Sequence, residues 1–123
     1  MLFRSLVLFD RVVDSFSVPK IRLDNSEGGR LATQHLIDQG YKRIAILAGP
    51  ENLNISNDRK EGYLQVLKQN KIPVNKDLIV NCDFNREYAY IATKGLLSMK
   101  KRPDAIFAIS DRLALGAMQA IKE

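Results

Sequence analysis

The sequence predicts an α/β fold in which a parallel sheet is flanked by helices, an arrangement that is Rossmann-like. From residue 18 onward, short apolar runs alternate with stretches in which apolar residues recur at helical spacing. The apolar runs are continuous rather than alternating with polar residues, which is typical of strands buried on both faces. Helices that cover both faces of a parallel sheet connect such strands most simply.

Five short apolar runs are predicted strands, and turn-forming or polar residues follow each of them. The runs are residues 6–9, 18–23, 43–48, 78–82 and 105–109. Because the strands are predicted to be parallel, the residues that follow them collect at one edge of the sheet. Ligands of open α/β sheets bind beyond that carboxyl edge.

Four helices are predicted after the second, third, fourth and fifth strands. The first begins near Ser26 and ends at Gly40, and its inward face is predicted to carry Leu31, Ala32, His35 and Leu36. The other helices are predicted to be capped by Asn57 or Asp58, by Asn85, and by Ser110 or Asp111. Residues 51–57 show the least regular pattern and are predicted to form an exposed loop.

The composition excludes several classes of protein. A hydrophobic content of 46% and a charged content of 27% are ordinary for a globular domain and argue against disorder. One cysteine, Cys82, and one histidine, His35, exclude a disulfide framework and a cysteine-rich zinc site, so we expect no metal and no cofactor. No stretch resembles a secretory signal or approaches the ~20 apolar residues of a membrane span, so we expect a cytoplasmic protein without a membrane partner.

The net charge of +5 does not by itself indicate a nucleic-acid-binding surface. The lysines and arginines lie on polar faces of predicted helices and in turns, with no dense basic stripe and no recognisable reading element. The run 100–102 falls where a helix is predicted to end, and cations are favourable there. We therefore expect no direct DNA contact by this segment.

The residues predicted to follow the strands suit a small polyhydroxylated ligand. Asp10, Glu27 and Ser110 supply oxygen atoms, Arg59 supplies a planar set of donors, and Phe84 offers an apolar face. Aspartate and serine after a strand are also common caps and turn formers, so a structural role remains open for each. Arg59 and Phe84 are neither typical helix caps nor turn formers. Their structural alternatives are a surface ion pair and a place in the core.

Catalysis is a weaker interpretation. The sequence contains no G-x-S-x-G elbow, no P-loop and no G-x-G-x-x-G motif. His35 is predicted to be packed on the apolar face of its helix, and Cys82 is predicted to be a buried, inert thiol. Asp83 and Asp111 are carboxylates suited in principle to acid–base chemistry, but no nucleophile and base are paired.

The order and spacing of several motifs resemble the effector-binding core of LacI-type bacterial transcription regulators, over residues 6–123. The motifs are Leu8-Phe9-Asp10-Arg11, Leu23-Asp24-Asn25-x-x-Gly28-Gly29, Arg43-Ile44-Ala45-x-Leu47-x-Gly49-Pro50, Arg59-x-x-Gly62-Tyr63 and Ser110-Asp111-x-x-Ala114-x-Gly116-Ala117. The resemblance implies a periplasmic-binding-protein-like fold of two lobes around a ligand cleft. It also implies that the two-lobe core is incomplete here and that a helix-turn-helix head is absent, as in a fragment of a regulator. Residues 1–40 resemble a late part of the first lobe and residues 41–123 most of the second.

The resemblance also implies roles for individual residues. Glu27 resembles an acidic contact to the effector, Arg59 the arginine that holds polar groups, and Phe84 the aromatic that stacks on the ligand. Ser110 stands where the family often has a polar asparagine. Asp10 is a weaker candidate.

Four further residues are candidates by position in the family. Leu53 and Ile55 lie in the predicted loop that borders the cleft, where an apolar pair favours a less hydroxylated edge of the ligand. The family forms side-by-side homodimers, and its interface includes the helix matching residues 112–123. Leu115 and Met118 are therefore candidate interface contacts, and the alternative is that they pack on their own sheet.

Taken with the resemblance, the sequence predicts the effector-binding, dimerising sensor portion of a transcription regulator. A small effector, a sugar or sugar derivative, would bind to it and alter DNA binding by a separate helix-turn-helix head. The alternative is a periplasmic sugar-binding receptor of a transport system, which shares the fold. A helix-turn-helix upstream favours regulation, and a signal peptide upstream favours transport.

Overall fold

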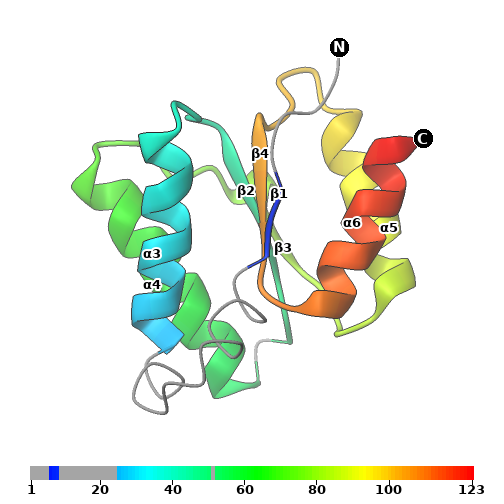
Figure 1. The fold of residues 1–123 in the computed structure, drawn as a ribbon, viewed down its shortest axis with the longest axis horizontal. Coiled ribbons are helices and arrows are strands. Elements are labelled where there is room, and N and C mark those ends of the chain that lie inside the picture. Colours follow the sequence, from blue (N-terminus) through cyan, green and yellow to red (C-terminus); the bar gives the residue numbers. More distant parts are fainter. Residues whose placement is uncertain (1–5, 9–24, 51) are drawn as a thin grey trace.

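The computed structural model describes residues 6–8, 25–50 and 52–123, and within them it contains one parallel sheet. The strands are β1 (Leu6–Leu8), β2 (Ile44–Ala48), β3 (Ile79–Asn81) and β4 (Ala105–Ala108), in the order β1-β4-β2-β3 (Figure 1). β4 pairs with β1 on one side and with β2 on the other. The predicted strand at 18–23 lies outside the described residues.

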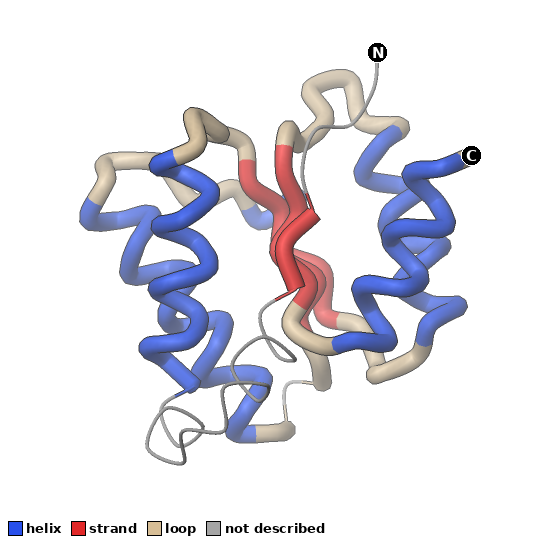
Figure 2. Tube along the Cα trace, viewed as in Figure 1, coloured by secondary structure: helices blue, strands red, loops and turns tan. Residues whose placement is uncertain are grey.

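Two pairs of helices cover the two faces of the sheet. Figure 2 shows the strands seen edge-on between the pairs. The helices α3 (Asn25–Asp38) and α4 (Asn54–Gln69) pack together on one face. On the other face α5 (Arg86–Leu97) packs with α6 (Asp111–Lys122), and a 3-10 turn η1 (Lys76–Leu78) precedes β3. The predicted α/β class with a helix-flanked parallel sheet is confirmed.

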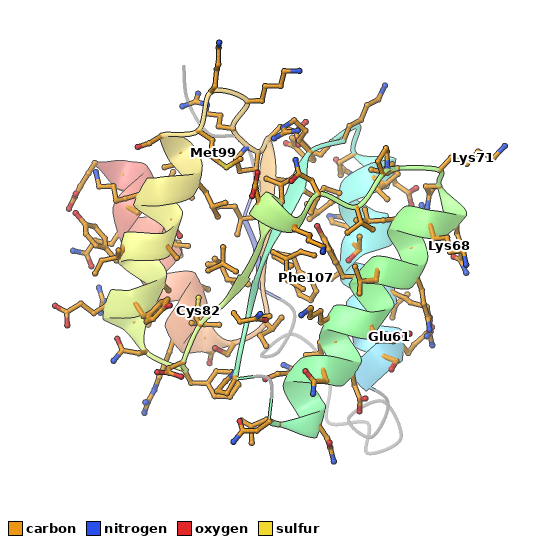
Figure 3. The ribbon with its side chains drawn as sticks, turned by 180° about the vertical axis from the view of Figure 1, so that it is seen from behind. Glu61, Lys68, Lys71, Cys82, Met99 and Phe107 are labelled. Atoms are coloured by element: carbon orange, nitrogen blue, oxygen red, sulfur yellow. The ribbon has the colours of Figure 1, made fainter. Side chains whose placement is uncertain are left out.

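The centre of the sheet forms the core. Every residue of β2 and β4 is buried, as the continuous apolar runs predict, whereas β3 is only partly covered at the sheet edge. Figure 3 shows the Phe107 side chain at the sheet, while Lys68 and Lys71 lie away from it on the outer side of α4 and just beyond its end. Phe107 has no exposed surface and is among the largest fully buried side chains.

The predicted loop at 51–57 and its helix caps are wrong, because α4 begins at Asn54. The amide of Leu53 donates to the carbonyl of Pro50 at 3.2 Å, and the amide of Asn57 donates to the carbonyl of Leu53 at 3.1 Å. The chain therefore turns directly into the helix. Leu53 occupies the N-cap without a side-chain hydrogen bond, so no capping side chain marks this start.

The predicted inward face of α3 is also partly wrong. Ala32 and Leu36 are buried as predicted, but Leu31 is 49% exposed and His35 is exposed. The reason is that α3 packs against α4 as well as the sheet, which turns its buried stripe toward Gly29 and the fully buried Thr33. His35 is consequently a solvated side chain rather than a packed one.

The described residues on both sides of residue 40 belong to the same sheet and its helix layers. β1 pairs with β4, and α3 packs on α4. The division into a first-lobe part, 1–40, and a second-lobe part, 41–123, stays a prediction.

Tyr63 links α4 to the sheet through a buried hydrogen bond. It is 1% exposed, and its hydroxyl donates to the carbonyl of Ile44 at 2.6 Å. Burial raises the pKa of the Tyr63 hydroxyl above its ordinary value of 10.0, because the phenolate is poorly solvated there. The unfolded chain then loses this proton at a lower pH than the folded protein, so Tyr63 lowers stability as the pH rises above about 10.

The change Tyr63→Phe is expected to lower the free energy of unfolding by about 1 kcal/mol at neutral pH, because one buried hydrogen bond is lost. The alkaline loss of stability above about pH 10 should become shallower in the variant. Urea unfolding at a series of pH values measures both effects. Tyr88→Phe, at a side chain that is 47% exposed, is the control and should change neither. An unaltered alkaline slope in Tyr63→Phe would contradict this assignment.

Candidate functional site

The carboxyl edge of the sheet brings together the ends of β2, β3 and β4 and the beginnings of α4, α5 and α6 (Figure 1). Backbone hydrogen bonds continue past the strands. The amide of Cys82 donates to the carbonyl of Ala48 at 2.6 Å, and the amide of Ile109 donates to the carbonyl of Leu47 at 3.3 Å. Residues that follow different strands are thus held in a fixed arrangement at this edge.

Arg59 reaches this edge from the second turn of α4. The side chain is half-buried, and its Nη1 donates to the carbonyl of Ile109 at 2.6 Å. This bond joins α4 to the residue that follows β4. It anchors one nitrogen of a guanidinium group, whose N–H groups are arranged to bind carboxylates and neighbouring hydroxyls.

The Phe84 ring lies beside Gly49, which follows β2. A Cβ atom placed on Gly49 would be 2.6 Å from Cζ of Phe84 and would also collide with Oγ of Ser56. The ring is partly buried and packs on the core, so it has both a structural contact and an accessible surface. Since β2 lies between β3 and β4, Arg59 and Phe84 flank the end of β2 from its two sides.

Ser110 lies at the same edge but has a capping role. Its Oγ accepts from the amide of Leu113 at 3.4 Å, as the N-cap of α6. Asn85 caps α5 in the same way, accepting from the amide of Tyr88 at 3.0 Å. Ser110 therefore has the structural role that the sequence left open for it, and it still borders the site.

Glu27 lies in the first turn of α3 and forms an ion pair with Arg30. The Oε1 atom of Glu27 is 2.7 Å from Nη2 of Arg30 and accepts from its Nε at 2.9 Å. Arg30 in turn donates from Nη1 to Oε1 of Gln65 on α4 at 2.9 Å. Glu27 is thus linked through Arg30 to α4.

The remaining predicted contacts are placed only in part. Leu53 is 40% exposed at the start of α4. Ile55 lies in the first turn of α4, so it belongs to a helix and not to a loop, and its side chain lies outside what the structure describes. Asp10 lies outside the described residues.

Ser56 is a residue of this edge that sequence reasoning missed. It is 1% exposed, and within the described part of the chain its Oγ has no hydrogen-bond partner. The mistaken prediction of a loop at 51–57 does not place Ser56 on a helix face. Ser56 precedes Arg59 by three positions and Tyr63 by seven, so the helical period places all three on the inward face of α4 once the helix is extended.

A groove of about 730 Å³ adjoins the edge on the side of α5 and α6. Its lining combines the Phe84 ring with polar side chains. The lining residues are Phe84, Asn85, Arg86, Glu87, Tyr90, Arg112 and Gln119. Phe84 therefore lies just beyond the end of β3 and also lines an open, mostly polar groove.

Cys82 is buried, as the sequence predicts. Burial and the negative charge of Asp83 raise the pKa of the Cys82 thiol to about 11, so the thiolate is scarce at neutral pH. Over residues 6–8, 25–50 and 52–123, no group of three metal-ligating side chains occurs. In the same ranges no helix is long and apolar enough to span a membrane.

Leu115 and Met118 point away from their own sheet. They are 47% and 42% exposed, whereas the opposite side of α6, with Leu113, Ala114 and Ala117, is buried. The alternative that Leu115 and Met118 simply pack on the sheet is therefore wrong.

A parallel sheet between two helix pairs, with polar groups and an aromatic ring at its carboxyl edge, defines a ligand-binding α/β domain. Residues 4–123 match the family described as periplasmic binding proteins and sugar binding domain of LacI family. The chain belongs to this family, and its fold is periplasmic-binding-protein-like.

Individual relatives agree with this assignment. The HTH-type transcriptional repressor PurR of Actinobacillus pleuropneumoniae is 44% identical over 102 residues, covering 82% of this chain and 30% of the repressor. The crystal structure of a LacI-family regulatory protein from Chloroflexus aggregans superposes with a TM-score of 0.78 at 37% identity, over 80% of this chain and 36% of that one. A complex of the transcriptional regulator CelR with cellobiose gives a TM-score of 0.76 at 35% identity, over 80% of this chain and 30% of that one.

The chain spans about a third of the length of these relatives. They are named as transcriptional repressors and regulators, not as enzymes or transport receptors. The predicted family is confirmed, and the regulator is favoured over the transport receptor.

Proposed function

We propose that this chain is the effector-binding, dimerising portion of a cytoplasmic LacI-type regulator, and that its effector is a sugar or sugar derivative. The observation that carries the proposal is the placement of the Arg59 guanidinium and the Phe84 ring on the two sides of the β2 end. An arginine donates parallel hydrogen bonds to vicinal oxygens, and an aromatic face covers the C–H surface of a sugar ring. The bound cellobiose of CelR, a relative at 35% identity, supports a carbohydrate.

The effector acts through its different affinity for two arrangements of the lobes. A ligand held by Arg59 and Phe84 on one lobe, and by a second lobe opposite, favours the arrangement in which both contacts are made. A helix-turn-helix head that binds operator DNA better in one arrangement then responds to the effector, and the coupling is reciprocal. We assign α3 to the same lobe as α4, because the two helices pack together.

The homodimer is proposed to form through the outer side of α6. Leu115 and Met118 are one helical turn apart and are both about half exposed. Exposed apolar side chains at this spacing form a stripe that a second copy of the chain covers in a two-fold arrangement.

The change Arg59→Ala in the full-length protein tests the effector site. Isothermal titration with a panel of pentoses, hexoses and disaccharides first identifies a sugar that binds. Arg59→Ala is then expected to weaken that sugar by at least about tenfold, because charge-assisted hydrogen bonds are lost.

The matched control is Arg102→Ala, which removes the same charge before the start of β4, at the opposite edge of the sheet. It should leave sugar affinity unchanged. Equal affinities for Arg59→Ala and the wild type would remove Arg59 from the site, and a panel without any binding sugar would contradict the carbohydrate proposal.

A further inference from the structure

We infer that Gly29 of α3 is a positioning residue for Arg59, because the absence of a side chain at Gly29 sets where the Arg59 turn of α4 lies. The consequence for effector affinity rests on the function proposed above. The geometric consequence, the place of the Arg59 side chain, does not depend on that function.

The two helices meet backbone to backbone at this point. A Cβ atom on Gly29 would collide with the carbonyl oxygen of Arg59 and lie 3.0 Å from its carbonyl carbon and 3.1 Å from its Cα. From the other helix, a Cβ atom on Gly62 would lie 2.7 Å from the amide nitrogen of Arg30 and 3.0 Å from the carbonyl carbon of Gly29. Real Cβ atoms essentially never approach within 3.0 Å, so an alanine at either glycine forces the helices apart.

The kind of neighbouring atom distinguishes the contact at Gly29 from the contact at Gly49. At Gly49 the closest atoms are the side chains of Ser56 and Phe84, which can rotate away. At Gly29 the three nearest atoms all belong to the backbone of Arg59 itself. Backbone atoms inside a helix cannot move without moving the turn. A methyl group at Gly29 therefore displaces the residue that is proposed to bind the effector.

Arg59 is sensitive to such a displacement because its side chain is already anchored. Nη1 donates to the carbonyl of Ile109 at 2.6 Å, which ties the Arg59 side chain on α4 to the residue that follows β4. One turn later, the hydroxyl of Tyr63 holds α4 on the sheet through the carbonyl of Ile44. The displacement is therefore concentrated in the first turns of α4, where it lengthens or breaks the Arg59–Ile109 bond.

The structure provides two matched controls. Gly116 makes an equally close crossing on the other face of the sheet, where an added Cβ would collide with the carbonyl oxygen of Arg86 and lie 2.9 Å from the amide nitrogen of Tyr90. Gly95 lies inside α5, and a Cβ there meets nothing within 4 Å. Gly116→Ala reports the effect of helix crowding in general, and Gly95→Ala reports the effect of an added methyl group alone.

The experiment follows the Arg59 side chain directly in the full-length protein labelled with ¹⁵N-arginine. Arg59→Lys identifies the Nε–Hε signal of Arg59 by its disappearance. In Gly29→Ala this signal is expected to shift or vanish, while in Gly116→Ala and Gly95→Ala it stays in place. An unmoved signal in Gly29→Ala, or an equal movement in Gly116→Ala, would overturn the inference.

Crowding at Gly29 also lowers stability, so spectra are compared in trimethylamine N-oxide, which favours compact states. A Gly29→Ala protein that stays unfolded there would leave Gly29 with a structural role alone and would equally overturn the inference.

Titration with the sugar found in the panel separates this inference from the proposed function. Gly29→Ala should weaken that sugar by about tenfold, and it should have no further effect when Arg59→Ala is already present. If Arg59→Ala leaves affinity unaltered while Gly29→Ala still moves the Arg59 signal, the proposed function fails and the positioning stands. If Arg59→Ala abolishes binding while Gly29→Ala changes neither signal nor affinity, the positioning fails and the function stands.

Discussion

Replacing Phe107 by alanine is expected to destabilise the domain by about 4 kcal/mol, a large fraction of the stability of a typical domain. Phe107 lies in β4, a strand paired on both sides, and it has no exposed surface. Figure 3 shows its ring at the sheet. Truncation removes a whole ring from the core, and fully buried neighbours such as Ile46, its register partner on β2, have little room to fill the cavity.

Urea unfolding of the full-length protein, followed at the transition of this domain, measures the loss. Ile91→Ala on α5, at a side chain that is 64% exposed, is the control and is expected to change stability by less than about 0.5 kcal/mol. Phe107→Leu, which keeps most of the apolar volume, should fall between the two. A Phe107→Ala protein as stable as Ile91→Ala would show that the ring is not part of the core.

The four strands of the described residues and most helices could be predicted because their signals are local. β2 and β4 are continuous apolar runs and are fully buried, and the Asn85 and Ser110 caps are where the sequence predicts them. The start of α4 could not be predicted in the same way. Leu53 makes no side-chain capping bond, and the helix begins from a backbone turn at Pro50. No capping residue in the sequence marks this start.

The candidate site was predictable in its residue types but not in its contacts. Arg59 and Phe84 stand out in the sequence because neither residue is a typical helix cap or turn former. The parallel sheet places both at one edge. Which atoms they touch depends on residues distant in sequence: Ile109 is fifty positions from Arg59. The close approach of Gly29 to Arg59 likewise depends on how α3 and α4 cross. The periodicity of each helix alone does not predict that crossing.

The double change Leu115→Lys and Met118→Lys is expected to weaken the proposed homodimer by at least about 100-fold. Both side chains are exposed in the single chain, so the lysines disturb no packing inside the domain. In the dimer the same positions would be covered, and covering an unpaired ammonium group removes its solvation without a compensating partner. The two copies would also place like charges opposite each other across a two-fold axis.

Sedimentation of the full-length protein over a range of concentrations measures the dissociation. The control is Val74→Lys, since Val74 is 48% exposed and Leu115 is 47% exposed, but Val74 lies just before η1 and far in sequence from α6. A lysine at Val74 adds one positive charge, where the α6 variant adds two, to an equally exposed apolar position, and it should leave the dimer intact. If both variants sediment as the wild type does, the outer side of α6 is not the interface. If Val74→Lys dissociates the protein as well, the effect belongs to added charge rather than to the stripe formed by Leu115 and Met118. Dissociation by the α6 variant alone identifies that stripe as the surface through which two effector-binding domains are joined, and it gives a monomer in which effector affinity can be measured free of the partner copy.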